Sequence, residues 1–113
     1  PLWSRGLGDV YKRQVQDEIE TRYTEKIPVE DLADRHAMGR RTLERRFRQA
    51  TGNSIVEYVQ RVRVEAAKKR LESSRKSVAE VMYEVGYNDT KAFRDIFNKY
   101  CGMSPVGYRE RYQ

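Results

Sequence analysis

The chain repeats itself at an interval of about 50 residues, and this repeat constrains the fold more than any other feature of the sequence. The recurring positions are apolar helix-face residues, glycine stops and serine caps. They are the pairs Leu43 and Phe93, Phe47 and Phe97, Gly52 and Gly102, Ser54 and Ser104, and Tyr58 and Tyr108, with Val29 and Val78 and Leu32 and Val81 at one residue less. A repeat of this length is one supersecondary unit. The sequence therefore predicts two copies of the same unit.

Each copy has the spacing of a helix-turn-helix. In the first copy, Pro28 precedes a short helix over residues 29–36, and Ala37-Met38-Gly39 form a tight connection to a second helix over residues 40–50. Thr51-Gly52 then ends that second helix. Two helices joined by a three- to four-residue turn containing glycine are typical of the helix-turn-helix.

Further helix signals divide the rest of the chain. Val15, Ile19 and Tyr23 recur every four residues, as on the buried face of an amphipathic helix. The remaining start signals are Ser54 with Glu57 and Ser77 with Glu80, which have capping-box spacing, then Asp89, and Ser104 followed by Pro105. No segment has the alternation of a strand. The predicted fold is all-α, with seven helices and two helix-turn-helix subdomains joined by a long linker helix.

The first fourteen residues are expected to differ in origin from the rest, with an ordinary basic, glycine-containing tail as the alternative. The segment SRGLGDVYKRQ, residues 4–14, looks like the translation of a transposase adapter used in sequencing libraries. Residues 1–14 are therefore expected to be a non-native tail, to be left out of fold reasoning. The domain is expected over residues 15–113, with the first unit at 15–53, the linker helix at 54–73 and the second unit at 74–113. A domain that precedes residue 15 in the natural protein is expected to be missing.

Composition narrows the kind of partner. The net charge is +6 and charged residues make up 35% of the chain, which favours a polyanionic partner. The single cysteine, Cys101, and the single histidine, His36, cannot assemble a disulfide or the usual His/Cys metal sites. They also lie in different halves, with no third catalytic partner suggested. We expect no catalytic residues, no metal, no cofactor and no enzyme activity. No apolar run is long enough for a membrane span, and a cytoplasmic location fits best.

The second helix of each unit carries the candidate base contacts. A helix-turn-helix places this helix in the major groove, where its exposed side chains reach base edges. Arginine can fork onto guanine O6 and N7, and glutamate can accept from cytosine N4. The predicted base contacts are Arg41, Glu44 and Arg45 in the first unit and Thr90, Lys91, Arg94 and Asp95 in the second. Alternatively, Asp95 pairs with Arg94 or Lys91 and contacts no base. Taken alone, a row of basic residues on one helix face can also be a solvated surface with no binding role.

Positions that flank these helices are candidates for phosphate contacts. Basic side chains and exposed amides at helix N-termini both bind phosphate. The predicted phosphate contacts are Arg40, Arg48, Ser54, Lys69, Ser104 and Arg109. The basic residues Arg61, Arg63, Lys68 and Arg70 on the linker helix, and Arg111 near the end, are further candidates. A role in solubility alone is the alternative for each basic residue.

The length of the linker helix suggests how the two units bind one duplex. Residues 54–73 span roughly 30 Å at 1.5 Å per residue, and one turn of DNA is about 34 Å. The two recognition helices can therefore enter successive major-groove segments, with some bending of the DNA.

Two other binding functions compete with DNA. A membrane-surface or protein-binding module of basic amphipathic helices would present Trp or Leu on its exposed faces, whereas Trp3 lies outside the predicted domain. Structured-RNA modules present aromatic stacking surfaces, but Phe47, Phe93 and Phe97 lie on predicted core faces. Double-stranded DNA remains the favoured partner.

Two strings resemble the AraC/XylS family of bacterial transcription regulators. They are RTLERRFRQATGNSIVEYVQRVRVEAAKKRL, residues 41–71, and VAEVMYEVGYNDTKAFRDIFNKYCGMSPVGYRERY, residues 78–112. The resemblance covers essentially all of residues 15–113. It implies the seven-helix, two-subdomain fold and promoter binding that activates or represses transcription. It also places the base contacts at the seven positions given above.

The resemblance also implies partners and shows two departures. Such domains usually follow a ligand-sensing or dimerising domain, and the strings look most like the subgroup in which that domain is amidotransferase-like. RNA polymerase is the further expected partner. Asp95 stands where the family often has a basic residue, and Gly39 stands where it often has serine, which weakens the first cap.

Overall fold

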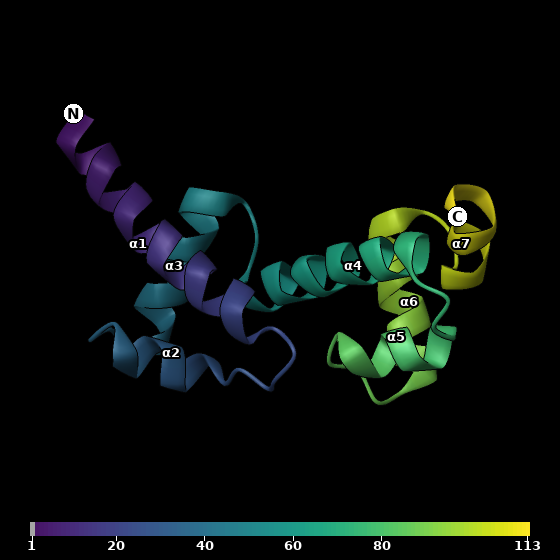
Figure 1. The fold of residues 1–113 in the computed structure, drawn as a ribbon. Coiled ribbons are helices and arrows are strands. Elements are labelled where there is room, and N and C mark those ends of the chain that lie inside the picture. The colour runs from purple at the N-terminus through teal and green to yellow at the C-terminus, as the bar shows by residue number, and fades with distance from the viewer. Residues whose placement is uncertain (1) are drawn as a thin grey trace. The chain divides into compact units, whose positions relative to one another are not determined.

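The structure, a computed structural model, describes the backbone of residues 2–113 and the side chains from Lys12 onward. Over that range the chain is all-α, with seven helices and no strand, which confirms the predicted fold class (Figure 1). The helices are α1 (Leu2–Arg22), α2 (Val29–Arg35), α3 (Arg40–Thr51), α4 (Ile55–Ser73), α5 (Val78–Glu84), α6 (Thr90–Cys101) and α7 (Pro105–Tyr112).

The helices form two compact units, and their boundary lies inside the linker helix. One unit comprises residues 1–22 and 26–59, and the other comprises residues 23–25 and 60–113. The linker helix predicted over residues 54–73 corresponds to α4. Ile55 is buried in the first unit, and Val64, Ala67 and Leu71 lie in the core of the second, so α4 contributes side chains to both cores.

The first unit is built on the predicted apolar faces. Its buried side chains are Val15 and Ile19 of α1, Val29, Leu32 and Ala33 of α2, Leu43 and Phe47 of α3, and Ile55 of α4. The Phe47 ring meets the edge of Tyr58 at 5.4 Å between centroids. Glu18 of α1 accepts from Arg35 at 2.7 Å and lies 3.1 Å from His36 Nε2, which joins α1 to the end of α2.

The second unit has an aromatic core. Phe93 and Phe97 of α6 are buried, and their rings lie 5.8 Å apart. Phe93 also contacts Tyr87 at 5.7 Å, and Phe97 contacts Tyr108 of α7 at 5.7 Å. Burying a large apolar side chain stabilises a fold by about 1.5–3 kcal/mol. The Phe93–Phe97 pair therefore fixes which face of α6 points into the unit.

The predicted helix caps are present. Ser54 and Glu57, and Ser77 and Glu80, make both reciprocal hydrogen bonds of a capping box. The remaining predicted N-caps accept one backbone hydrogen bond each: Asp89 from Ala92 at 3.1 Å and Ser104 from Gly107 at 3.0 Å. Gly39 gives α3 no side-chain cap, as its missing side chain requires.

The turns that precede α3 and α6 share one backbone geometry. After α2, the Met38 amide bonds to the Ala33 carbonyl and the Ala37 amide to Asp34; after α5, Tyr87 bonds to Met82 and Gly86 to Tyr83. Both turns are Schellman motifs, which place one residue in the left-handed region. That residue is Gly86 (φ 104°) in the second turn but Ala37 (φ 54°) in the first. The sequence pattern did not predict the strained alanine.

We expect Ala37→Gly to stabilise the first unit by up to about 1 kcal/mol. Glycine relieves the left-handed strain of roughly 1–2 kcal/mol but loses more backbone entropy on folding. Gly86→Ala should destabilise by more than 1 kcal/mol, since its Cβ would also lie 3.0 Å from the Thr24 carbonyl oxygen and from Arg63 Cζ. Urea unfolding of both variants measures this, and a loss of stability in Ala37→Gly would contradict it.

Helix α1 begins at Leu2 rather than at Val15, where the pattern predicted its start. A helix that is anchored by packing at one end extends at little further nucleation cost. Val15 and Ile19 are the buried residues of α1 within the described side chains. The adapter origin of residues 4–14 stays a prediction, because a helical backbone does not depend on where its coding sequence came from.

Deleting residues 1–14 is expected to leave the thermal midpoint of the chain unchanged, because Val15 and Ile19 remain in place. Circular dichroism melts of the full and shortened chains provide the test. A change of 1 kcal/mol shifts the midpoint of a domain of this size by roughly 4–8 °C. A fall of that size would show that the segment contributes to packing.

Candidate nucleic-acid interface

Helix α3 presents a basic face opposite its buried one. Leu43 and Phe47 are 2% and 3% exposed, whereas Arg41 and Arg45 are exposed and Glu44 is half-buried. The twelve residues of α3 contain five arginines and one glutamate, a net charge of +4. The structure thus places the three candidate base contacts of the first unit on the side of α3 that faces away from its core.

Arg40 at the start of α3 has a protein partner. Its guanidinium pairs with the carboxylate of Glu30 in the first turn of α2. A backbone hydrogen bond, together with this arginine, lowers the pKa of Glu30 below its usual value. Both side chains are exposed, so the pair is weak and a phosphate can compete for the arginine.

Helix α6 presents the equivalent face in the second unit. Phe93 and Phe97 are buried, and the predicted contacts Thr90, Lys91, Arg94 and Asp95 are all exposed. Lys91 Nζ lies 2.9 Å from Asp95 Oδ2, one helical turn away. This hydrogen bond raises the pKa of Lys91. The geometry thus favours the alternative in which Asp95 holds Lys91.

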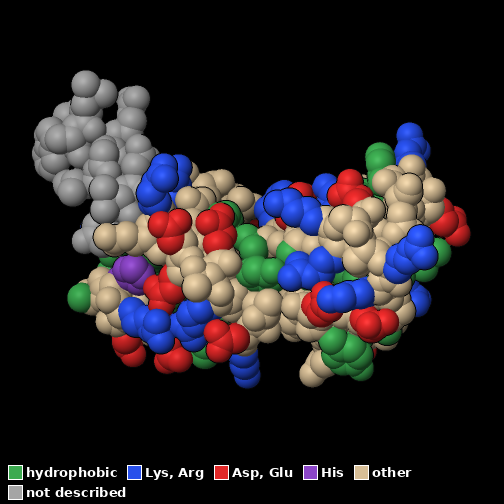
Figure 2. Space-filling view, viewed as in Figure 1, with side chains coloured by type: hydrophobic (Ala, Val, Ile, Leu, Met, Phe, Trp, Pro, Cys, Tyr) green, Lys and Arg blue, Asp and Glu red, His purple; other side chains and the backbone are tan. Residues whose placement is uncertain are grey.

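Helices α3 and α6 differ in charge. Helix α6 carries Lys91, Arg94 and Lys99 against Asp95, a net charge of +2, which is half that of α3. At the position equivalent to Arg48 of α3, α6 has Asn98. Figure 2 shows that Lys and Arg side chains alternate with carboxylates on the face drawn, so positive charge on that face forms no single continuous patch.

The candidate phosphate contacts fall into two groups. The side chains of Arg48 and Lys69 are exposed, so both cations are accessible to a phosphate. The hydroxyls of Ser54 and Ser104 accept hydrogen bonds from Glu57 and Gly107, so these serines act as caps. Because Pro105 has no amide hydrogen, the start of α7 offers fewer donors than a typical helix start.

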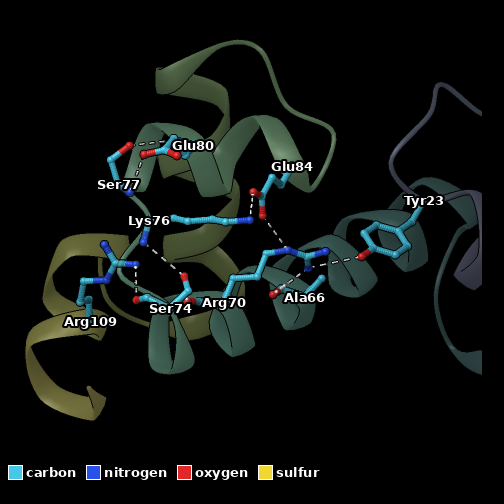
Figure 3. Close-up of polar contacts among 9 residues, drawn as sticks. All are labelled: Tyr23, Ala66, Arg70, Ser74, Lys76, Ser77, Glu80, Glu84 and Arg109. Carbon is cyan, nitrogen blue, oxygen red and sulfur yellow. Dashed lines mark hydrogen bonds and ion pairs between the residues drawn. The ribbon is translucent and has the colours of Figure 1, made fainter.

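Arg109 contacts the protein itself. Its Nε donates to the Leu71 carbonyl at 3.3 Å. Its Nη2 donates to the Ser74 carbonyl at 3.4 Å (Figure 3). These carbonyls lie at the C-terminus of α4, where backbone acceptors lack intrahelical partners. Arg109 therefore caps α4 from α7 in the free chain. Its predicted phosphate contact would require it to leave these acceptors.

Two further linker arginines also donate to protein acceptors. Arg70 Nε donates to Glu84 of α5 at 3.0 Å, and Lys76 pairs with the same carboxylate (Figure 3). Both cations lower the pKa of Glu84. Arg63 donates to the carbonyls of Tyr23 and Glu25. Arg63 and Arg70, which the basic pattern made candidates for phosphate contacts, thus donate to groups of the protein itself, and each is followed in the chain by a buried residue, Val64 or Leu71.

No group of three His, Cys, Asp or Glu residues in the described part of the chain can hold a metal ion. In that same part, no helix is both long enough and apolar enough to cross a membrane.

Comparison with known proteins identifies the family. The profile described as "Helix-turn-helix domain" matches residues 32–111. The Msm operon regulatory protein of Streptococcus mutans is 35% identical over 103 residues, covering 91% of this chain and 37% of that protein. An AraC-like transcription regulator of Streptomyces lividans is 32% identical over 108 residues, covering 96% of this chain and 36% of that protein. The chain belongs to the AraC-type helix-turn-helix family.

A solved structure shows a similar domain bound to DNA. The DNA-binding domain of AdpA, solved in complex with a target DNA, is 37% identical to this chain and superposes with a TM-score of 0.83. The match covers 89% of this chain and 91% of that domain. The chain spans a little more than a third of the length of the two curated relatives above.

We expect Asp95→Asn to raise the affinity of the AraC-type domain for all duplexes alike, by roughly two- to fivefold, because it releases Lys91 from an exposed ion pair. Glu110→Gln, which removes an exposed carboxylate outside α6, is the charge-matched control. Fluorescence anisotropy with several duplexes makes the comparison. If affinity instead falls for one base pair at one position, Asp95 contacts a base.

Proposed function

We propose that this chain is the DNA-binding output domain of an AraC/XylS-type transcription regulator and that it binds promoter DNA in a sequence-specific manner. The observation that carries the proposal is the matched geometry of α3 and α6. Each follows a Schellman turn, buries a pair of large apolar side chains and exposes a polar face opposite that pair. A recognition helix requires this arrangement.

In this proposal, α3 and α6 each enter the major groove. Arg41 and Arg45 donate to guanine O6 and N7, and Glu44 accepts from cytosine N4. In the second unit, Arg94 is the principal base contact. Its neighbours Thr90 and Lys91 lie on the same exposed face.

Phosphate contacts supply the affinity that does not depend on sequence. Arg40, Arg48 and Lys69 are exposed cations at or near α3 and α4 and are the favoured candidates. Each phosphate that is neutralised releases counterions, so binding should weaken steeply as salt is raised. Ser54 and Ser104 contribute through the helix starts that they cap rather than through their occupied hydroxyls.

The length of α4 supports binding to successive turns of one duplex. Its 19 residues correspond to about 28 Å of helix, close to the 34 Å of one DNA turn. We infer an operator with two short blocks about one helical turn apart.

The regulatory role follows from DNA binding. We propose that the chain controls transcription as an activator or repressor together with RNA polymerase in the cytoplasm, under a further effector or dimerisation domain, and that the domain itself catalyses no reaction. The relatives whose names describe regulators are about two and a half times as long as this chain, which leaves room in them for such a domain.

Selection of duplexes from a random pool by the whole chain at physiological salt tests the proposal. We expect two conserved blocks about one helical turn apart. Recovery of no motif, with binding that vanishes as salt rises, would contradict base recognition and leave a basic helical domain only.

Single substitutions separate base from phosphate contacts. Arg45→Ala and Arg94→Ala should each cost about 1–3 kcal/mol and relax the base preference at one position. Lys69→Ala should weaken binding to all sequences alike. It should also reduce the slope of log affinity against log salt concentration by about one. Binding of operator variants over a salt series makes the distinction, and equal effects of all three changes on every sequence would show that the base contacts are wrongly assigned.

A further inference from the structure

Arg63 of α4 lies among three segments of the second unit. Its Nε donates to the Tyr23 carbonyl at 2.6 Å, and its Nη2 donates to the Glu25 carbonyl at 2.9 Å. Its Cζ lies 4.9 Å from the centroid of the Tyr87 ring. It also approaches the Gly86 backbone closely, since a Cβ on Gly86 would lie 3.0 Å from Cζ. The guanidinium is thus held by two acceptors and one aromatic face.

The contacts of Arg63 lead directly to a recognition helix. Gly86 and Tyr87 form the Schellman turn that ends α5, three residues before α6 begins at Thr90. The Tyr87 ring packs on Phe93, which is 1% exposed and fixes the buried face of α6. The Tyr87 hydroxyl is buried and has no hydrogen-bond partner among the described residues, so its ring is held by packing and by Arg63.

Arg63 also contacts the segment Tyr23–Glu25. This segment belongs to the second unit although α1 before it and Lys26 after it belong to the first. Tyr23 packs on the core of the second unit, and its hydroxyl accepts from Arg70 at 3.4 Å. Because two backbone carbonyls accept from Arg63, its hold on this segment does not depend on the side chains of Tyr23 and Glu25.

We propose that Arg63 is a positioning residue for base recognition by α6, acting through the stacked Tyr87 ring and the Gly86 turn. Arginine suits this place because its planar group can donate through several N–H groups and stack on a ring at the same time. Lysine, a compact charge, can replace the hydrogen bond to one carbonyl but not the whole set. The inference rests on the proposed function, since it assumes that α6 contacts bases.

The test compares base discrimination in the two blocks of the selected operator. Arg94→Ala first identifies the block that α6 contacts. For the wild-type chain, one wrong base pair in either block should weaken binding by about tenfold. For Arg63→Ala, the penalty in the α6 block should fall to roughly twofold, while the penalty in the other block stays at about tenfold. Arg63→Lys should give an intermediate penalty in the α6 block.

Matched variants separate positioning from charge and from folding. Arg75→Ala removes an exposed arginine from the loop after α4 and should leave both penalties unchanged. Tyr87→Phe keeps the ring and should resemble the wild-type chain, whereas Tyr87→Leu should resemble Arg63→Ala. If Arg63→Ala does not fold, as judged by circular dichroism, Arg63→Lys and Tyr87→Leu decide the matter.

The outcomes distinguish this inference from the proposed function. If the wild-type chain selects no motif, the proposed function fails and this inference fails with it. If the wild-type chain selects two blocks but Arg63→Ala behaves like Arg75→Ala, only this inference is overturned. A third outcome is that Arg63→Ala weakens binding to all sequences alike and reduces the slope of log affinity against log salt concentration by about one. That result would make Arg63 a phosphate contact and would also overturn this inference.

Discussion

The burial of one pair of large side chains on each recognition helix is the constraint on which the rest of the structure depends. Leu43 and Phe47 fix α3, and Phe93 and Phe97 fix α6, in the cores of their own units. At 3.6 residues per turn, burying these positions leaves the opposite face to solvent. Residues on that outward face can therefore vary without changing the buried pair, which under the proposed function allows them to follow the bases of an operator.

The basic side chains fall into two groups, those that donate to the protein itself and those that are exposed to a binding partner. Arg63, Arg70 and Arg109 donate to carbonyl or carboxylate groups of the chain itself. Arg41, Arg45 and Arg48 of α3 and Arg94 of α6 are exposed to solvent instead. Net charge alone does not separate these two groups. The internal arginines lie on α4 and α7, beside helix ends and turns, where backbone acceptors lack partners.

Local features of the fold could be predicted from the sequence. The capping boxes at Ser54 and Ser77 and the glycine stops act over three or four residues, so their spacing is visible in one chain. The repeat then gave the two units and the exposed faces of α3 and α6.

Features that depend on distant partners could not be predicted. Arg63 meets Tyr23 across 40 residues, and Arg109 meets Leu71 across 38. Nothing in the spacing of a single sequence shows that these two arginines, rather than the other basic residues, donate to distant backbone carbonyls. The same holds for the segment Tyr23–Glu25, which belongs to the second unit because of tertiary contacts alone. The strained Ala37 was missed for another reason, since the pattern indicates glycine at that conformation.

The unequal charge of α3 and α6 is a property of the two helices and not of their whole units. Helix α3 carries a net charge of +4 and α6 a net charge of +2, whereas the first unit carries +2 in all and the second carries +4. At physiological salt, exposed charges are screened over about 8 Å, so the two helices differ in their attraction for a polyanion only at short range. Two copies of one fold thus differ in the charge of an exposed helix face while each keeps its buried pair behind it.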